Sequence, residues 1–380
     1  MRFPEFSGEW KKCKFGDIAT GFDYGMNAAA KPFDGENKYI RITDIDEASS
    51  TYNDKDIVSP DGRLTDNYVV NDRDILLVRT GASTGKSYLY RKSDGKLYYA
   101  GFLIRANITE HNPYFVFSQL HTHRYWRWVS IMSARSGQPG INSQEYSSFP
   151  IFTTSLHEEN KISTLLSLLN ERIVTQNKII EDLKKLKSAI VDKLYSSAKG
   201  ETYSFRQLFE VVNEKNKKLI YSNVLSASQE LGMIERSDIN IDIKFEQNSI
   251  SEYKIVRKGD YVVHLRSFQG GFAFSDRTGI CSPAYTILHP NDLVAYGYLS
   301  HFFISKPFIK SLKLVTYGIR DGRSINVDEW LDMTVTLPTK REQSHILAII
   351  NAIDNKLHNE NQIHNYMFRQ RTYLLKTMFI

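Results

Sequence analysis

The sequence predicts an α+β fold in which two similar strand-rich domains are joined by two long helices. We expect these helices to pair antiparallel as a coiled coil and the chain to contain a pseudo-two-fold internal repeat. Three observations lead to this prediction. A heptad pattern of apolar residues runs from Glu158 to Tyr195, the same pattern returns 184 residues later, and a strand-like segment precedes each copy.

The first strand-like segment contains a glycine loop, "LLVRTGASTGKSYLY", at residues 76–90. A phosphate-binding P-loop needs the pattern G-x-x-x-x-G-K-[ST] and opens a helix. Here Gly81 and Gly85 enclose three residues instead of four, and the stretch after Lys86 is rich in aromatic residues typical of strands. We therefore predict that this loop connects two strands, and we reject ATP hydrolysis by this chain.

The dipeptide Asp94-Gly95 separates two β-rich runs, which predicts a tight hairpin turn. Pro60-Asp61 and the later Asp94-Gly95-Lys96 resemble the scattered motif of a metal-dependent nuclease site. We set this alternative aside because the turn needs Asp94 and Gly95.

The first long helix is predicted from a seam of apolar residues at alternating steps of four and three. Only Gln176 and Lys187 interrupt the seam. Its apolar members are Ile162, Leu166, Leu169, Ile173, Ile180, Leu183, Ile190 and Leu194.

The second long helix repeats this seam at an offset of 184 residues. Glu360 and Arg371 stand at the positions of Gln176 and Lys187, and His364 is one further polar interruption. Its apolar members are Ile346, Ile350, Ile353, Leu357, Met367, Leu374 and Met378. Two apolar stripes cannot remain in water alone, so the economical prediction is that they pair with each other. The alternative is that the helices are rods that dimerise the chain.

The segments before the helices repeat as well. At the same offset "INSQEYSSF" (141–149) aligns with "INVDEWLDM" (325–333), and "NDRDILLVRTGASTGKSYLY" (71–90) corresponds loosely to "RKGDYVVHLRSFQGGFAFSD" (257–276). The sequence thus predicts a first domain at 1–152, a helix at 153–199, a second domain at 200–337 and a helix at 338–380. Each domain should be a twisted, mostly antiparallel sheet with flanking helices.

Composition excludes several classes of protein. The 380 residues suggest two or three domains, and Cys13 and Cys281 form no C-x-x-C motif, so a zinc ribbon or a disulfide framework is unsupported. No apolar run has the length of a signal peptide or a membrane span, so we expect a cytoplasmic protein without membrane contact. The net charge of +6 permits a polyanionic partner. His121 and His123 lack an evident third ligand, so no metal is expected.

At this point the chain resembles the specificity subunits of Type I restriction-modification systems, in which each of two recognition domains is followed by a long helix. The resemblance rests on the helix entries "LPTKREQSHILAIINAID" (337–354) and, more loosely, "FPIFTTSLHEENKISTLLSLLNERI" (149–173), and on the two strand-loop segments above. Glu159 stands where the family usually has glutamine.

The resemblance implies a subunit with no catalytic residues and no cofactor of its own, which recognises double-stranded DNA as two separated half-sites. It would bind methyltransferase subunits, expected to number two, and motor-nuclease restriction subunits, so that S-adenosylmethionine and ATP are used by the partners. The absence of an N/D-P-P-Y/F motif agrees with this. The alternative, from another class, is a non-catalytic scaffold whose domains bind proteins.

Residues that recognise DNA bases are expected on loops. Arg can form two hydrogen bonds with guanine, and Gln and Asn can form two with adenine, so these residue types are the candidates. "SARSGQPGIN" and "YGIRDGRSIN" occupy equivalent places in the two repeats, as duplicated DNA-facing loops would. The alternative for each residue is a solvated turn. The predicted DNA-binding residues are Arg79, Thr80, Ser83, Lys86, Arg135, Ser136, Gln138, Arg266, Gln269, Arg320 and Arg323.

Overall fold

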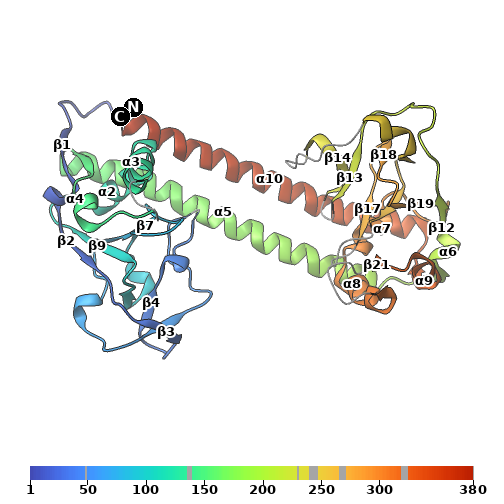
Figure 1. Cartoon of the computed structure of the whole chain (residues 1–380), viewed down its shortest axis with the longest axis horizontal. Helices are drawn as coiled ribbons and strands as arrows, with labels where there is room; N and C mark the ends of the chain where they lie inside the picture. Colours follow the sequence, from blue (N-terminus) through green and yellow to red (C-terminus); the bar gives the residue numbers. More distant parts are fainter. Residues whose placement is uncertain are drawn as a thin grey trace. The chain divides into compact units, whose positions relative to one another are not determined.

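The computed structural model describes residues 1–47, 49–134, 139–228, 231–238, 247–264, 271–317 and 324–379. It divides into two compact units. Unit 1 consists of residues 1–179 and 360–380, and unit 2 of residues 180–359. Each unit therefore contains one strand-rich domain together with parts of both long helices, α5 (Leu156–Ser196) and α10 (Lys340–Met378), which Figure 1 shows in green and red.

Unit 1 is built on a four-stranded antiparallel sheet with the order β2-β9-β6-β7. Its strands are β2 (Ala19–Tyr24), β9 (Leu103–Ile108), β6 (Asp74–Val78) and β7 (Ser87–Leu89). The central strand β6, "DILLV", is buried on both faces: Ile75 and Leu77 lie in the core under helices α2 and α3, whereas Leu76 and Val78 lie in a second core on the opposite face. Alternation with a period of two thus divides one apolar run between two cores.

Shorter elements complete unit 1. The two-stranded pairs are β1 (Lys11–Lys14) with β10 (Pro150–Thr153), β3 (Ala29–Pro32) with β5 (Val58–Asp61), and the parallel pair β4 (Lys38–Ile40) with β8 (Leu97–Tyr99). The helices are α1 (Phe15–Ile18), α2 (Pro113–Gln119), α3 (His123–Ser133) and α4 (Ser143–Ser147).

Unit 2 repeats this topology. Its four-stranded antiparallel sheet has the order β12-β19-β16-β17, from β12 (Phe209–Val212), β19 (Thr286–Pro290), β16 (Tyr261–Val263) and β17 (Phe272–Phe274). The pairs are β11 (Glu201–Ser204) with β22 (Thr334–Leu337), β13 (Leu225–Ser228) with β14 (Gly232–Glu235), β15 (Lys254–Val256) with β18 (Gly279–Cys281), and β20 (Thr316–Tyr317) with β21 (Ser324–Ile325). The helices are α6 (Phe205–Leu208), α7 (Tyr298–Phe303), α8 (Lys306–Ser311) and α9 (Val327–Asp332). The two units confirm the predicted α+β fold with an internal repeat.

The seam between α5 and α10 is present in both units. In unit 1 the N-terminal half of α5 packs Ile162 and Leu169 against Leu374 and Met378 of α10. In unit 2 the C-terminal half of α5 lies against the N-terminal half of α10, where Val191 and Leu194 share a core with Ile346 and Ile350. The pairing is therefore antiparallel, as the sequence predicts.

The polar interruptions of the seam have partners. Gln176 Nε2 donates to Oε2 of Glu360 at 2.5 Å and to its carbonyl oxygen at 3.1 Å, and both side chains are buried. Glu360 is the repeat equivalent of Gln176, so the interruption at the middle of the seam pairs with its own copy. In unit 2 Lys187 forms an ion pair with Asp354 at 2.5 Å.

The predicted hairpin at Asp94-Gly95 is wrong, although the predicted strand connection by the glycine loop is correct. The glycine loop joins β6 to its antiparallel neighbour β7. Gly95 has a positive φ of 76°, as a turn requires, but β7 and β8 on either side of it belong to different sheets. The turn is fixed from elsewhere, because Lys38 Nζ donates to the carbonyl of Asp94 and Tyr88 Oη donates to its carboxylate.

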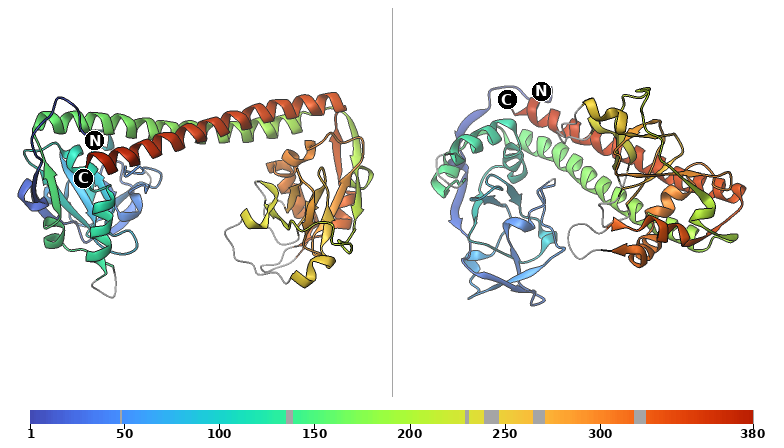
Figure 2. Two further views of the ribbon diagram at one scale, coloured as in Figure 1. Left: turned by 90° about the horizontal axis from the view of Figure 1, so that it is seen from above. Right: turned by 45° about the vertical axis from the view of Figure 1, so that its right-hand side comes forward.

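The chain termini meet in unit 1. The amino group of Met1 donates to the carbonyl of Thr377, and both views in Figure 2 place the N-terminus beside the end of α10. Phe3 and Trp10 pack into the same apolar cluster as Phe379. Among the described residues, no helix is both long and apolar enough to cross a membrane.

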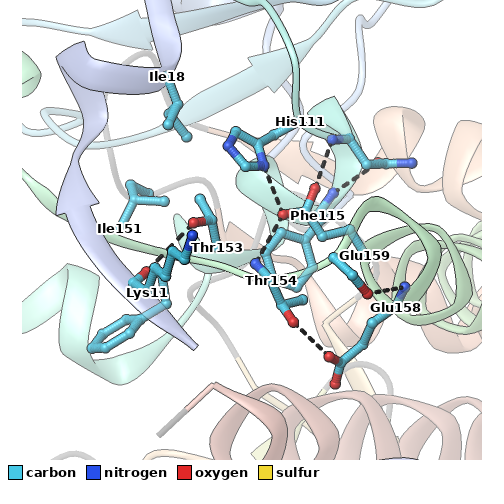
Figure 3. A network of polar contacts seen from close by, with 12 residues as sticks. Lys11, Ile18, His111, Phe115, Ile151, Thr153, Thr154, Glu158 and Glu159 are labelled. Atoms are coloured by element: carbon cyan, nitrogen blue, oxygen red, sulfur yellow. Dashed lines mark hydrogen bonds and ion pairs between the residues drawn. The ribbon is translucent and has the colours of Figure 1, made fainter. Parts of the chain in front are cut away.

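A buried polar side chain at equivalent positions near the N-terminus helps to attach each long helix to its domain. In unit 1 Glu159 accepts hydrogen bonds from His111 Nδ1 at 2.8 Å, from Asn112 N at 2.9 Å and from Thr154 N at 3.2 Å (Figure 3). All three donors come from segments outside α5. The carboxylate is fully buried, so these bonds replace its hydration.

The equivalent residue in unit 2 is Gln343, which both donates and accepts hydrogen bonds. Its Nε2 donates to the carbonyls of Leu293 and Pro338, and its Oε1 accepts from Ala295 N at 2.7 Å. The surroundings explain why unit 1 has glutamate where unit 2 has glutamine. Glu159 is surrounded by three donors, whereas Gln343 is surrounded by two acceptors and one donor.

We expect Glu159→Gln to lower the free energy of unfolding by about 1–3 kcal/mol, since an amide nitrogen would face a buried donor. Gln343→Glu should be more harmful, because a buried carboxylate would face two carbonyl oxygens. Denaturant midpoints of the full chain measure both effects. Glu171→Gln, an exposed change of the same kind on α5, serves as the control. Three indistinguishable midpoints would show that these bonds do not hold the helices to the domains.

Candidate nucleic-acid interface

The β6–β7 loop of unit 1 is held in one conformation by its own backbone. Gly81 and Gly85 both have positive φ, at 79° and 94°. Gly85 N donates to the carbonyl of Val78, and Thr84 Oγ1 donates to the carbonyl of Gly81 at 2.7 Å. A Cβ at Gly85 would lie 2.7 Å from Val129 of α3, so this glycine is also required by packing.

This loop is tied to the segment that follows α3. Gly81 N donates to the carbonyl of Pro139 at 3.0 Å, Ile141 N donates to the carbonyl of Arg79 at 2.9 Å, and Thr80 forms a β-bridge with Gly140. Two regions chosen from the sequence as DNA-facing loops are therefore neighbours in unit 1. The fold brings Arg79 and Thr80 beside the residues that immediately follow Gln138.

Arg79 lies among aromatic side chains. Its guanidinium carbon lies 4.7 Å from the ring centroid of Tyr24, and its backbone N–H donates to the carbonyl of Phe102 at 3.1 Å. The three residues line a concave region of about 630 Å³ together with Arg41. A guanidinium stacked on a ring keeps its donors directed along its edge, where a base or a phosphate can accept them.

Sequence reasoning missed Tyr24 and Phe102. Phe102 is 60% exposed at the turn between β8 and β9, and Tyr24 is 41% exposed while its hydroxyl accepts from Ser143 N. The only available signal for Phe102 was an aromatic residue after Gly101 between two strand-like runs. This pattern is equally typical of a buried strand residue, and only the fold decides that the Phe102 side chain is exposed.

Lys86 lies apart from Arg79. It forms an ion pair with Glu47 at 3.4 Å and lines a different concave region of about 910 Å³, between α3 and the last turns of α10. Ser83 remains in the β6–β7 loop, where its carbonyl accepts from Lys86 N. The four described candidates therefore form one group around Arg79 and a separate cation at Lys86.

The remaining candidates lie outside the described residues. They are Arg135, Ser136, Gln138, Arg266, Gln269, Arg320 and Arg323. In unit 2 the flanks of the equivalent loop are described. His264 N donates to the carbonyl of Gly271, and a Cβ at Gly271 would lie 2.9 Å from Ile325 of β21. The end of the β16–β17 connection, at Gly271, thus lies close to β21.

His121 and His123 have different environments. His121 Nδ1 donates to the carbonyl of Phe117 at 2.9 Å and its Nε2 lies 3.0 Å from Ser50 Oγ, whereas His123 is exposed. Burial lowers the pKa of His121 to about 4, and the nearby Arg371 lowers it further in the same direction. Within the described part of the chain, no three His, Cys, Asp or Glu side chains are placed to hold a metal ion.

Comparisons with known proteins agree with this arrangement. Residues 200–366 match the family described as Type I restriction modification DNA specificity domain. The chain is 23% identical over 386 aligned residues to the Type I restriction enzyme MjaVIII specificity subunit of Methanocaldococcus jannaschii, covering 93% of this chain and 88% of that protein.

Two solved structures share the fold. The Type I restriction-modification system S subunit from M. genitalium matches with a TM-score of 0.59 at 14% identity, over 98% of this chain and 96% of that one. A chain from a study of complex assembly and conformational transition of the type I R-M system matches with the same TM-score and identity, over 96% of both chains.

The half-buried His121 predicts a loss of stability in acid. Its pKa is about 4 in the folded chain against about 6.5 when unfolded, so below pH 6.5 only the unfolded chain takes up the proton. Stability should therefore fall between pH 6.5 and pH 4, by about 2 kcal/mol at pH 5. Denaturant unfolding of the full chain at pH 7.5 and pH 5 measures this.

In His121→Gln the acid-dependent loss should be smaller by that amount, while the exposed His123→Gln should behave like the parent chain. His301 of unit 2, whose pKa burial also lowers to about 4, contributes equally to all three proteins. An unchanged acid-dependent loss in His121→Gln would contradict this account.

Proposed function

We propose that this chain is a specificity subunit of a Type I restriction-modification system and selects a DNA target made of two half-sites, one read by each recognition domain. In this proposal the domains span 1–152 and 200–337, and the helices at 153–199 and 338–380 are spacers. The observation that carries it is the duplicated strand-loop-strand unit, β6–β7 and β16–β17. In unit 1 the loop of this unit is hydrogen-bonded to a second segment at Pro139 and Ile141.

The geometry around Arg79 supports base reading by this residue. Its backbone is held on both sides by Phe102 and Ile141, and its guanidinium is stacked on Tyr24, so little rotational freedom is lost on binding. Arg reads guanine through two parallel hydrogen bonds to O6 and N7. We assign direct base contacts to Arg79 and Thr80, and backbone positioning to Lys86.

The partners we propose are methyltransferase subunits, two in number, and restriction motor-nuclease subunits. Support comes from the outer flank of the paired helices in unit 1, where large apolar side chains remain exposed. Each directly precedes a residue of the seam, so they lie on the same flank of the helix pair. They are Leu165, Leu168 and Ile179 of α5 and Ile363, Tyr366 and Tyr373 of α10.

We further propose that the chain is non-catalytic and acts in the cytoplasm. Methyl transfer and ATP-driven cleavage would then require the partner subunits. The rival function is a scaffold that binds only proteins. Binding to duplex DNA with a steep salt dependence distinguishes the two, because phosphate contacts release counterions.

The decisive experiment is methylome sequencing of cells that express this chain with its methyltransferase subunit. One modified motif with two specified parts and an unread gap is expected. The proposal would be refuted if no such motif were modified although the complex assembles. The control is that the same methyltransferase subunit modifies DNA when it is paired with another specificity subunit.

Two substitutions test the assigned roles. Arg79→Ala should weaken binding by about 1–3 kcal/mol selectively through one base pair of one half-site. Lys86→Ala should weaken binding equally on cognate and unrelated duplexes and reduce the salt slope by about one unit. Filter binding of the methyltransferase complex across single-base target variants measures both, and equal losses on all DNA for Arg79→Ala would show that it contacts the backbone.

A further inference from the structure

The last turns of α10 carry an uncompensated cation. Arg371 is half-buried in the seam of unit 1, and none of the described residues gives its guanidinium a hydrogen bond or an ion pair. Burial lowers its pKa, which means that the surroundings disfavour its charge. A half-buried charge without a partner is costly unless something compensates it.

The repeat provides an internal control for this position. Subtracting 184 from 371 gives Lys187, which in unit 2 has Asp354 as its ion-pair partner at 2.5 Å. Subtracting 184 from 354 gives Asn170, so unit 1 has an amide where unit 2 has the carboxylate. Asn170 is buried and its Oδ1 has no hydrogen-bond partner. Unit 1 thus has the cation without the carboxylate that accompanies its equivalent in unit 2.

Arg371 lines the concave region of about 910 Å³ between α10, α3 and the start of β7. Its cationic lining consists of Lys86, Arg124, Arg371 and Lys376, against the two carboxylates of Asp46 and Glu47. Glu47 is mostly exposed and is already paired with Lys86. The interior of this region is therefore positively charged.

Two further polar groups in this region lack partners. Ser87, which is 2% exposed, has a hydroxyl without any hydrogen bond, and Arg124 Nε is buried without an acceptor, while Nη2 of the same guanidinium donates to Gln119 Oε1 at 3.2 Å. Buried polar atoms are normally satisfied, so each of them indicates an absent partner. A group with several acceptor oxygens would serve Ser87, Arg124 and Arg371 alike.

The same region also offers an aromatic surface. Trp126 of α3 and Phe368 of α10 both line it and are 42% and 45% exposed. Aromatic side chains beside a cationic groove are the usual combination for binding a base together with its phosphate. A single carboxylate would fill only a small part of the volume and would leave these rings uncovered.

We propose that this region of unit 1 is a binding site for a nucleotide, with its phosphate oxygens on Arg371, Arg124 and Ser87 and its base against Trp126. The ligand is either a free nucleotide or a nucleotide of a nucleic-acid strand. The site includes Lys86 and Ser87 at the end of the glycine-loop segment but not Gly81 or Gly85, and it does not require the P-loop that the length of this segment excludes. It does not depend on base reading by Arg79. Occupancy ties the last turns of α10 to α3 and β7.

Calorimetric titration of the full chain with ADP, with inorganic phosphate and with a short single-stranded oligonucleotide tests the proposal. One equivalent of ADP or of the oligonucleotide should bind. Arg371→Ala should weaken this binding about tenfold or more, through loss of a charged hydrogen bond. Arg369→Ala, the same change on the exposed side of α10, should leave it unchanged.

Asn170→Asp is the sharper variant, because it restores in unit 1 the carboxylate that unit 2 has at Asp354. It should stabilise the unliganded chain against denaturant and weaken ADP binding, since Arg371 then has an internal partner. A second readout is the titration of His121 by NMR. An added phosphate beside Arg371 should raise the pKa of His121, which Arg371 now helps to lower.

Binding of ADP identifies a free nucleotide as the ligand, whereas binding of the oligonucleotide alone identifies a strand. Binding of inorganic phosphate alone, or retention of ADP affinity in Arg371→Ala, overturns the proposal, as does the absence of binding by all three ligands. The methylated motif of the complex is measured in parallel. An unchanged motif in Arg371→Ala separates this site from target recognition, so failure of either proposal is visible independently.

Discussion

The structure depends on the antiparallel seam between α5 and α10. Neither helix could stay in water alone, since each carries an apolar stripe along its length. The duplication solves this problem economically, because the two copies of one stripe become partners. At the middle of the seam the polar interruption meets its own copy, Gln176 against Glu360, and both are buried and hydrogen-bonded. An unpaired polar group there would favour another register, so this pair helps to fix the alignment of the helices.

The seam can position the domains only if each helix is attached firmly to its own domain. A buried side chain at the same repeat position contributes to this in each unit, Glu159 or Gln343, and the two satisfy different sets of donors and acceptors. The pair shows how a duplicated sequence diverges without changing its fold. A carboxylate is tolerated at Glu159 because His111 and two backbone N–H groups surround it, while the carbonyls around Gln343 require an amide.

Divergence has gone further at the surfaces. In unit 1 the β6–β7 loop presents Arg79 beside Tyr24 and Phe102. By strand register, Val78 of unit 1 corresponds to His264 of unit 2, so the sequences of the two loops differ from this position onward. Arg371 lacks an equivalent of the carboxylate with which Lys187 is paired in unit 2. Two domains of one topology can therefore bind different partners, because the sheets set the positions while the loops and the helix ends set the chemistry.

The sequence by itself determined the duplication, the two long helices and their antiparallel pairing, because a heptad pattern repeated at one offset has few other solutions. It also determined that the glycine loop joins two strands, since the loop is one residue too short for a P-loop. Only the tertiary structure decided the rest. Asp94-Gly95 turns between different sheets because Lys38 and Tyr88 hold it, Phe102 is exposed rather than buried, and Lys86 faces α10 instead of Arg79. These outcomes depend on contacts between residues far apart in the chain, which local patterns do not encode.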